Sequence, residues 1–128
     1  GHPAASAAAL ANIALMENER IPQRVQKTGK LFENNLHKLA DLDLVGEVRG
    51  SHFMMGIEFV KEKTSKTPFE PKDKIGLKIA RAAQRRGLIV RPLGNIAILS
   101  PTLIMDEEMI GEVVDIMSNS IKEVQSAL

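Results

Sequence analysis

The chain has 128 residues, with 17 lysines and arginines against 16 aspartates and glutamates, so its net charge is close to zero. This length fits one domain with a core of its own. The charge balance implies no basic face, which argues against nucleic acid or an anionic membrane as a partner. The chain has no cysteine, which excludes disulfides and thiolate metal sites.

The aromatic share of the chain is only 3%, and it contains neither tryptophan nor tyrosine. Because this is unusual for a free-standing enzyme, we expect the chain to be a fragment of a longer protein. No apolar run approaches the roughly 20 residues needed to span a bilayer. The N-terminus has no signal-peptide pattern. We therefore expect a cytoplasmic location.

The first half of the chain predicts two helices followed by two strands. Residues 4–18 are alanine-rich and predict a helix, with Pro3 near its start. Pro22 opens a second helix. Its apolar face recurs at helical spacing and consists of Val25, Thr28, Phe32, Leu36 and Leu39. The period then changes, and short strands are predicted at residues 46–49 and 53–60.

A loop and a third helix follow these strands. Residues 61–71 are polar and hold two prolines, which predicts an exposed loop. Residues 72–86 predict a helix, with Ile75, Ile79 and Ala82 facing inward. Gly87 stands where a glycine commonly terminates a helix.

The last part of the chain predicts two strands and a long helix. Strands at residues 88–91 and 95–99 are joined by a turn at Gly94 and Asn95. Asp106 can cap the last helix, where acidic residues also suit the helix dipole. Its apolar stripe is predicted to contain Met109, Val113, Ile116, Ser120, Ile121, Val124 and Leu128.

This order of elements, ααββαββα, predicts an α+β fold in which a small, mostly antiparallel sheet packs against helices. The sequence contains no internal repeat and no low-complexity tract. Fold reasoning alone therefore indicates an α+β domain and gives no function.

The usual catalytic side chains form no recognisable pattern. His2, His37 and His52 are far apart and lack metal-ligand spacing, and His37 is expected to be a surface residue on a helix. The serines lack a partner histidine and acid at the spacing of a nucleophile triad. The glycines form no phosphate-binding loop. We predict no catalytic residue and no metal site in this chain.

Arg91 requires an explanation, because it ends the predicted strand "LIVR", and Pro92 directly after it is expected to stop the strand pairing. A guanidinium at the end of an apolar strand is costly unless an anion meets it. One interpretation is an ion pair with an aspartate or glutamate from another helix. The other is a substrate carboxylate, which the planar guanidinium binds through two parallel hydrogen bonds. The sequence alone does not decide between these two interpretations.

Four stretches in register resemble the C-terminal part of the class III (omega) aminotransferases, which are pyridoxal-phosphate enzymes of fold type I. They are "GHPAASAAALANIALME", "LVGEVRGSHFMMGIEFV", "RRGLIVRPLGN" and "ILSPTLIMDEEMI". Two departures stand out. Ser51, His52 and Phe53 replace the family's usual Gly-Leu-Met context, and Thr102 replaces the second proline of its "SPP".

The resemblance implies a division of the chain and a role for Arg91. It implies a helix at the junction with a cofactor domain in residues 1–20 and the small C-terminal domain in residues 21–128. In this family the Schiff-base lysine and the phosphate-binding residues lie upstream of the segment that matches Gly1, His2 and Pro3. We therefore expect the intact parent to bind pyridoxal 5'-phosphate, and we expect these 128 residues alone to bind none and to be inactive. By motif position, Arg91 matches the arginine that binds the carboxylate of the amino acceptor.

The resemblance thus implies a transaminase that moves an amino group from an amine or omega-amino acid to pyruvate or a similar 2-keto acid. Its partners would be these substrates and a second subunit, as a homodimer. Two alternatives stay open at this point. One is a non-catalytic α+β interaction or regulatory domain, and the other is the small domain of a related aminomutase or decarboxylase.

Overall fold

The computed structural model describes all residues 1–128 and has the α+β architecture that the sequence predicts. The helices are α1 (Pro3–Asn18), α2 (Ile21–His37), α3 (Ile75–Arg85) and α4 (Glu107–Gln125). The strands are β1 (Val45–Ser51), β2 (Met54–Glu62), β3 (Thr67–Pro68), β4 (Arg91–Leu93) and β5 (Ile96–Leu99). Two short 3-10 turns, η1 (Lys38–Asp41) and η2 (Pro71–Asp73), complete the order. No helix combines the length and the hydrophobicity that a membrane span requires.

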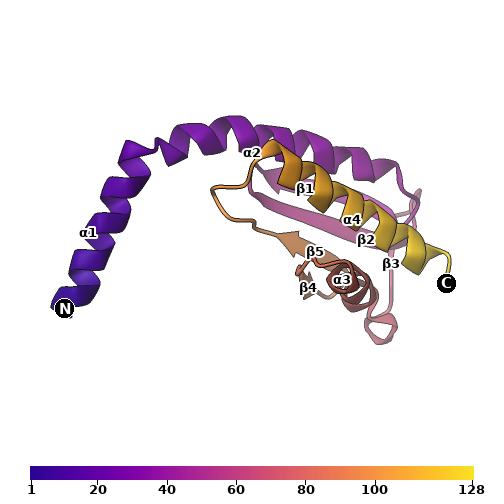
Figure 1. Ribbon diagram of the computed structural model, residues 1–128. Helices are drawn as coiled ribbons and strands as arrows, with labels where there is room; N and C mark the ends of the chain where they lie inside the picture. Colours follow the sequence, from indigo (N-terminus) through magenta and orange to yellow (C-terminus); the bar gives the residue numbers. More distant parts are fainter.

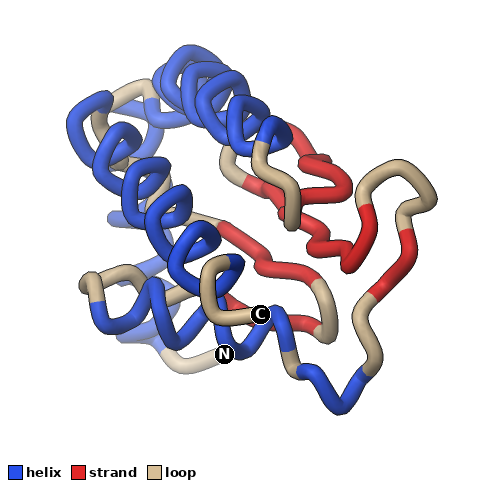
Figure 2. The backbone as a smooth tube through the Cα atoms, turned by 90° about the vertical axis from the view of Figure 1, so that its right-hand side faces the viewer, coloured by secondary structure: helices blue, strands red, loops and turns tan.

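The strands form one antiparallel sheet in the order β1-β2-β5-β4, and the short β3 pairs with β2. The helices α2, α3 and α4 pack on one face of this sheet (Figures 1 and 2). The second face of the sheet, here called the open face, is covered by no helix of this chain. The antiparallel α+β prediction is therefore confirmed.

The core lies between the sheet and the three helices that cover it. A cluster of 25 buried residues fills this layer. Fully buried side chains come from every part of it, including Phe32 of α2, Ile57 and Phe59 of β2, and Met117 and Ile121 of α4. Phe32 also meets Phe53 edge to face, with ring centroids 5.6 Å apart. The chain thus has a hydrophobic core of its own.

The predicted faces of α2 and α3 are confirmed. Thr28, Phe32 and Leu36 are buried and Val25 is half-buried, while Leu39 is buried in η1 directly after the helix.

The inward side of α3 is also as predicted, because Ile75, Ile79 and Ala82 are fully buried. These helices show the clear amphipathic spacing that packing against a sheet requires.

The stripe predicted for α4 is wrong at both ends. Met109 lies in the first turn and is 42% exposed, and Leu128 follows the last turn and is 62% exposed. The residues that face the core are instead Ile110 and Met117, together with the predicted inner positions. The cap itself is confirmed, since the Asp106 carboxylate accepts a hydrogen bond of 2.9 Å from the Met109 amide.

Helix α1 is confirmed at residues 3–18 but contributes nothing to the core of this chain. It projects away from the other elements (Figure 1), and it contains no buried residue. Leu10, Ile13 and Leu15 are each more than half exposed. Arg20, with a left-handed φ of 51°, separates α1 from α2. The two helices are therefore distinct elements.

The boundaries around α3 differ from the predicted ones. The polar loop at residues 61–71 contains β3, and the helix begins at Ile75 rather than at residue 72. Glu70 and Asp73 hold η2 by hydrogen bonds between their side chains and each other's backbone. Lys74 then takes a left-handed φ of 50°, which separates the short turn η2 from helix α3.

The strand predicted at residues 88–91 is wrong in its position. Residues 88–90 pair with no strand, and β4 consists of Arg91, Pro92 and Leu93. The predicted end of pairing at Pro92 is also wrong, because Pro92 lies in register with Ala97. An edge strand tolerates a proline, since its missing N–H removes no hydrogen bond to a further strand. The turn at Gly94 and Asn95 is confirmed, with Gly94 at a φ of +57°.

Glu62 gives the stability of the loop after β2 a pH dependence. Its carboxylate accepts hydrogen bonds from the Ser65 hydroxyl and from the backbone amides of Ser65 (2.5 Å) and Thr64 (2.8 Å). These bonds, the Ser65 hydroxyl first, lower the pKa of Glu62 to about 2. A lowered carboxyl pKa contributes stability above the unfolded value of 4.5, and this contribution is lost as the pH falls towards 2.

We therefore expect Glu62→Gln to lose less stability than the unchanged chain between pH 5 and pH 2.5. The measurement is the urea midpoint of unfolding at both pH values. Glu112→Gln is the matched control, because Glu112 is exposed on α4 and forms no ion pair or side-chain hydrogen bond. Equal loss in Glu62→Gln and in the unchanged chain would show that this loop does not contribute.

Candidate functional site

Arg91 lies at the start of the edge strand β4, with its side chain exposed on the open face of the sheet. Directly opposite residues of antiparallel strands share a face. Arg91 pairs with Ile98, Ile98 pairs with Gly56, and Gly56 pairs with Arg49. These four residues thus form one row across the sheet, with an arginine at each end.

The open face next to Arg91 is apolar rather than polar. Ile96 and Ile98 of β5 point to this side and are half-buried, while Leu93 of β4 is 53% exposed and Met54 of β2 is 75% exposed. A sheet face that meets only water normally carries polar residues at such positions. The composition of this face therefore favours a protein surface packed over it.

A shallow depression of about 370 Å³ lies on the open face beside this row. It is lined by Arg49, Gly50, Met54, Met55, Gly56, Ile96, Ile98 and Ser100. Gly56 leaves its floor open, because it has no side chain between Ile98 and Arg49. Ile98 lies between this depression and Arg91, which is its pairing partner on β4.

Arg49, at the other end of the row, already has its anions. It forms ion pairs with Glu58 and, at 3.3 Å, with Glu47. The hydrogen bond to Glu58 is the main cause that raises the pKa of Arg49. This guanidinium is therefore engaged within the sheet and is not available for a ligand without losing these partners.

Arg91 has no such partner in this chain. It forms neither an ion pair nor a side-chain hydrogen bond, so the pairing with an acid from another helix does not occur. Its five donors are free on an apolar surface. A free guanidinium among apolar neighbours is a group that can bind a carboxylate through two parallel hydrogen bonds.

His52 and its surroundings form a structural turn. The Ser51 hydroxyl lies 2.7 Å from His52 Nδ1, and Glu33 Oε2 lies 3.8 Å from the same nitrogen. A nucleophile triad needs the hydroxyl and the acid on opposite ring nitrogens, so this arrangement is not one. Glu33 also accepts a 3.0 Å hydrogen bond from the His52 amide. Its pKa is lowered first by the hydrogen bond from Lys30 and then by this amide.

The two remaining histidines and the acidic residues form no metal-binding group. His37 is exposed at the end of α2, as predicted. No three histidine, aspartate or glutamate side chains lie close enough to hold a metal ion.

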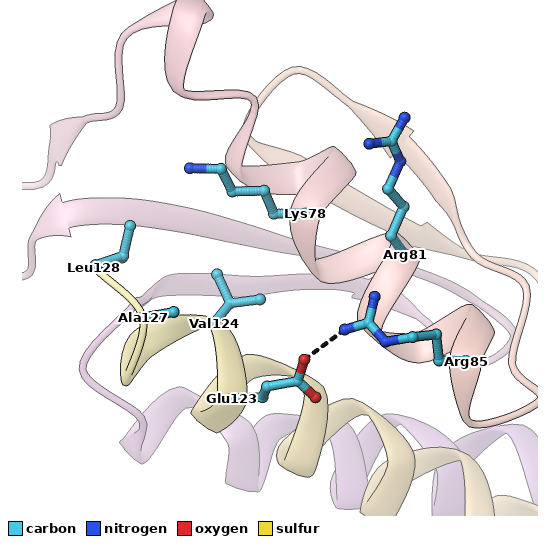
Figure 3. A pocket seen from close by; sticks show the side chains of 7 residues that line it. All are labelled: Lys78, Arg81, Arg85, Glu123, Val124, Ala127 and Leu128. Carbon is cyan, nitrogen blue, oxygen red and sulfur yellow. Dashed lines mark hydrogen bonds and ion pairs between the residues drawn. The ribbon is translucent and has the colours of Figure 1, made fainter.

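A groove of about 270 Å³ between α3 and α4 has three cationic side chains in its lining. Its cations are Lys78, Arg81 and Arg85 of α3 (Figure 3). Figure 3 shows that Lys78 and Arg81 point away from one another, and that Arg85 reaches Glu123 of α4. Hydrogen bonds from Arg86 and Arg85 lower the pKa of Glu123. The groove is therefore a helix–helix contact closed by ion pairs, and its cations do not converge on a ligand.

The chain offers no lysine where a cofactor aldehyde could be attached next to Arg91. All ten lysines are exposed, and none lines the depression beside the Arg91 row. No glycine-rich loop at a helix start forms a phosphate cradle. The residues present thus do not make up a pyridoxal phosphate site, and Arg91 is the group on the open face that has the chemistry to bind a substrate carboxylate.

The family model for class III aminotransferases matches residues 1–121. The chain belongs to the class III aminotransferases. It is 39% identical over 123 residues to an adenosylmethionine-8-amino-7-oxononanoate aminotransferase of Methanocaldococcus jannaschii, covering 96% of this chain and 27% of that protein. It is 33% identical over 129 residues to a putrescine–pyruvate aminotransferase of Pseudomonas aeruginosa, covering the whole chain and 28% of that protein.

A solved structure of similar fold is the (S)-enantioselective omega-transaminase of Thermomicrobium roseum. It matches with a TM-score of 0.92 and 32% identity, over 97% of this aminotransferase chain and 28% of the solved one. The chain therefore spans a little over a quarter of the length of these relatives. The family resemblance and the fold expected from it are confirmed.

Sequence reasoning singled out Arg91 but missed the rest of its surface. The two-residue turn at Gly94 and Asn95 would have placed Arg91 opposite Ile98 if the strands had been assigned as β4 and β5. The alternation of β5, with Ile96 and Ile98 on one side and Ala97 and Leu99 on the other, was a further signal for a sheet with two apolar faces.

Proposed function

We propose that this chain is the small C-terminal domain of a pyridoxal-phosphate-dependent transaminase. The transaminase moves an amino group from an amine or omega-amino acid to pyruvate or a similar 2-keto acid. Residues 21–128 are the domain itself, and residues 1–20 form the helix at the junction with a cofactor domain. The parent acts as a homodimer in the cytoplasm.

The observation that carries this proposal is the free guanidinium of Arg91 on the open, apolar face of the sheet. In our proposal Arg91 receives the carboxylate of the keto acid. An exposed ion pair contributes little, so the carboxylate contact needs a covered, partly dry surface. The apolar neighbours Leu93, Ile96 and Ile98 fit such a cover, supplied by the remaining part of the enzyme.

The residues of this chain bind and orient the acceptor and do not carry out the chemistry. Pyridoxal phosphate, when bound to the parent, supplies the electron sink and carries the amino group between the two substrates. The exposed apolar side chains of α1, such as Leu10 and Ile13, fit a helix that packs at the junction. The 128 residues alone bind no cofactor and are inactive in this proposal.

The experiment follows the absorption band of the cofactor in the full-length protein. An amine donor is added first and pyruvate second, and the same mixture is tested with the 128-residue chain alone. The proposal expects the amine to bleach the band and pyruvate to restore it, with no band retained by the isolated chain. A full-length protein that retains no cofactor would contradict the transaminase assignment. A band that bleaches and is restored by no keto acid would favour a related aminomutase or decarboxylase.

A further inference from the structure

Helix α3 and the β4–β5 hairpin meet backbone to backbone at Gly76. A Cβ atom added to Gly76 would lie 2.4 Å from the carbonyl oxygen of Gly94 and 3.3 Å from that of Ile96. α3 lies beside both strands of the hairpin (Figure 1). Because the nearest atom is a main-chain oxygen, no side-chain rotation can make room for the added methyl group. Gly76 therefore sets how closely α3 approaches the hairpin turn.

The same turn is anchored by the segment that precedes α3. The side-chain amide of Asn95 donates a hydrogen bond of 2.9 Å to the carbonyl oxygen of Phe69, which is itself buried. The carbonyl oxygen of Asn95 accepts a bond of 2.8 Å from the Phe59 amide in β2. The turn thus has contacts to α3, to the segment before it and to the central strand.

The hairpin is the part that yields if this contact is crowded. α3 is fixed in the core, because Ile75, Ile79, Ala82 and Ala83 are all fully buried. β4, in contrast, is an edge strand whose three residues are all exposed and which pairs only with β5. We therefore expect a methyl group at residue 76 to displace the turn at Gly94 and the edge strand β4 rather than the helix.

We propose that Gly76 is a positioning residue for Arg91. This inference rests on the proposed function, in which Arg91 binds the acceptor carboxylate. Arg91 lies in the strand directly before the turn that Gly76 contacts, so a shift of the turn is passed to Arg91 through three residues of extended chain. A displacement of about 1 Å in a substrate-binding group can reduce a rate by about 100-fold.

The test is Gly76→Ala in the full-length, cofactor-loaded protein. We expect KM for pyruvate to rise by about tenfold or more, because the carboxylate contact is misplaced. The rate at which an amine without a carboxylate bleaches the cofactor band should stay unchanged, since that step makes no use of Arg91. If the role of Gly76 were purely structural, the substitution would impair the reaction with the amine and the reaction with pyruvate alike.

Two glycine variants serve as matched controls. Gly111 lies in α4 with open space at its Cβ position, so Gly111→Ala should leave both steps unchanged. Gly29 lies in α2 with its Cβ position 2.7 Å from the Cβ of His52, so Gly29→Ala also creates crowding, but at the β1–β2 turn. It should affect thermal stability without the selective rise of KM for pyruvate.

Asn95→Ala is the second variant in case Gly76→Ala does not fold, and it should raise KM for pyruvate in the same selective way. Unchanged KM in a folded Gly76→Ala or Asn95→Ala protein would overturn the inference, provided that Arg91→Ala does raise KM. If Arg91→Ala itself leaves KM for pyruvate unchanged, the proposed function fails instead. The two failures are therefore distinguishable.

Discussion

Arg91→Ala should lower kcat/KM for pyruvate by about 100-fold in the full-length aminotransferase, while the reaction with an amine donor proceeds as before. Truncating one partner of a desolvated charge pair costs about 3 kcal/mol, which corresponds to this factor. The amine step should be unaffected, because a donor without a carboxylate makes no demand on the guanidinium. The measurement is the single-turnover rate of each step, followed through the cofactor band.

Arg81→Ala is the matched control for this prediction. Arg81 is also an exposed arginine without an ion pair, but it lies on α3 in the groove of Figure 3, away from the open face. The control should react with pyruvate at the unchanged rate. If the two variants behave alike, Arg91 is an ordinary surface residue and the site assignment is wrong.

Phe32→Ala should reduce the free energy of unfolding by about 3–5 kcal/mol, the usual cost of truncating a buried phenylalanine to alanine. Phe32 is fully buried in α2 and contacts Phe53 edge to face. It also lines a small, mostly apolar pocket of about 70 Å³ with Leu99 and Met105, so the truncation would enlarge an existing gap in the packing. Urea unfolding of the 128-residue chain measures the change.

Two substitutions bracket this result. Phe32→Leu keeps most of the apolar volume and should cost clearly less than the alanine variant. Leu103→Ala, at a side chain that is 43% exposed, should change stability by less than about 0.5 kcal/mol. A Phe32→Ala chain as stable as Leu103→Ala would mean that the contact between α2 and the sheet does not hold the core together.

Much of the fold follows from local patterns that the sequence carries. The apolar spacing of α2 identified Phe32 and Leu36 as core residues, and the carboxylate of Asp106 caps α4 as its position indicates. Gly87 ends α3 with a φ of +91°, which suits a glycine. These features depend on neighbours within one or two turns of chain, so sequence reasoning reaches them.

The position of β4 could not be predicted in the same way. Leu88, Ile89 and Val90 have the composition of a strand, but they form the unpaired connection after α3, and Ile89 is 84% exposed. Pairing instead begins at Arg91 and includes Pro92, because the turn at Gly94 sets the register and the edge position tolerates proline. Strand assignment here depends on the hairpin rather than on composition.

The contacts that hold the candidate site in place also cannot be predicted from local sequence patterns. Gly76 looks like an ordinary helix residue in the sequence, and only the packing of α3 on the hairpin reveals its approach to the Gly94 carbonyl. Likewise, nothing in the sequence shows that Arg49 has its own acids whereas Arg91 has none. Both facts depend on residues that come together through long-range folding.

The most direct test of the central claim compares two acceptors of similar size, pyruvate and propanal, in the unchanged protein and in Arg91→Ala. Propanal has the carbonyl group but lacks the carboxylate. If Arg91 binds that carboxylate, the preference for pyruvate over propanal in kcat/KM falls by about 100-fold in the variant, and the rate with propanal is retained. An equal preference in both proteins would contradict the assignment of Arg91 as the acceptor-binding residue.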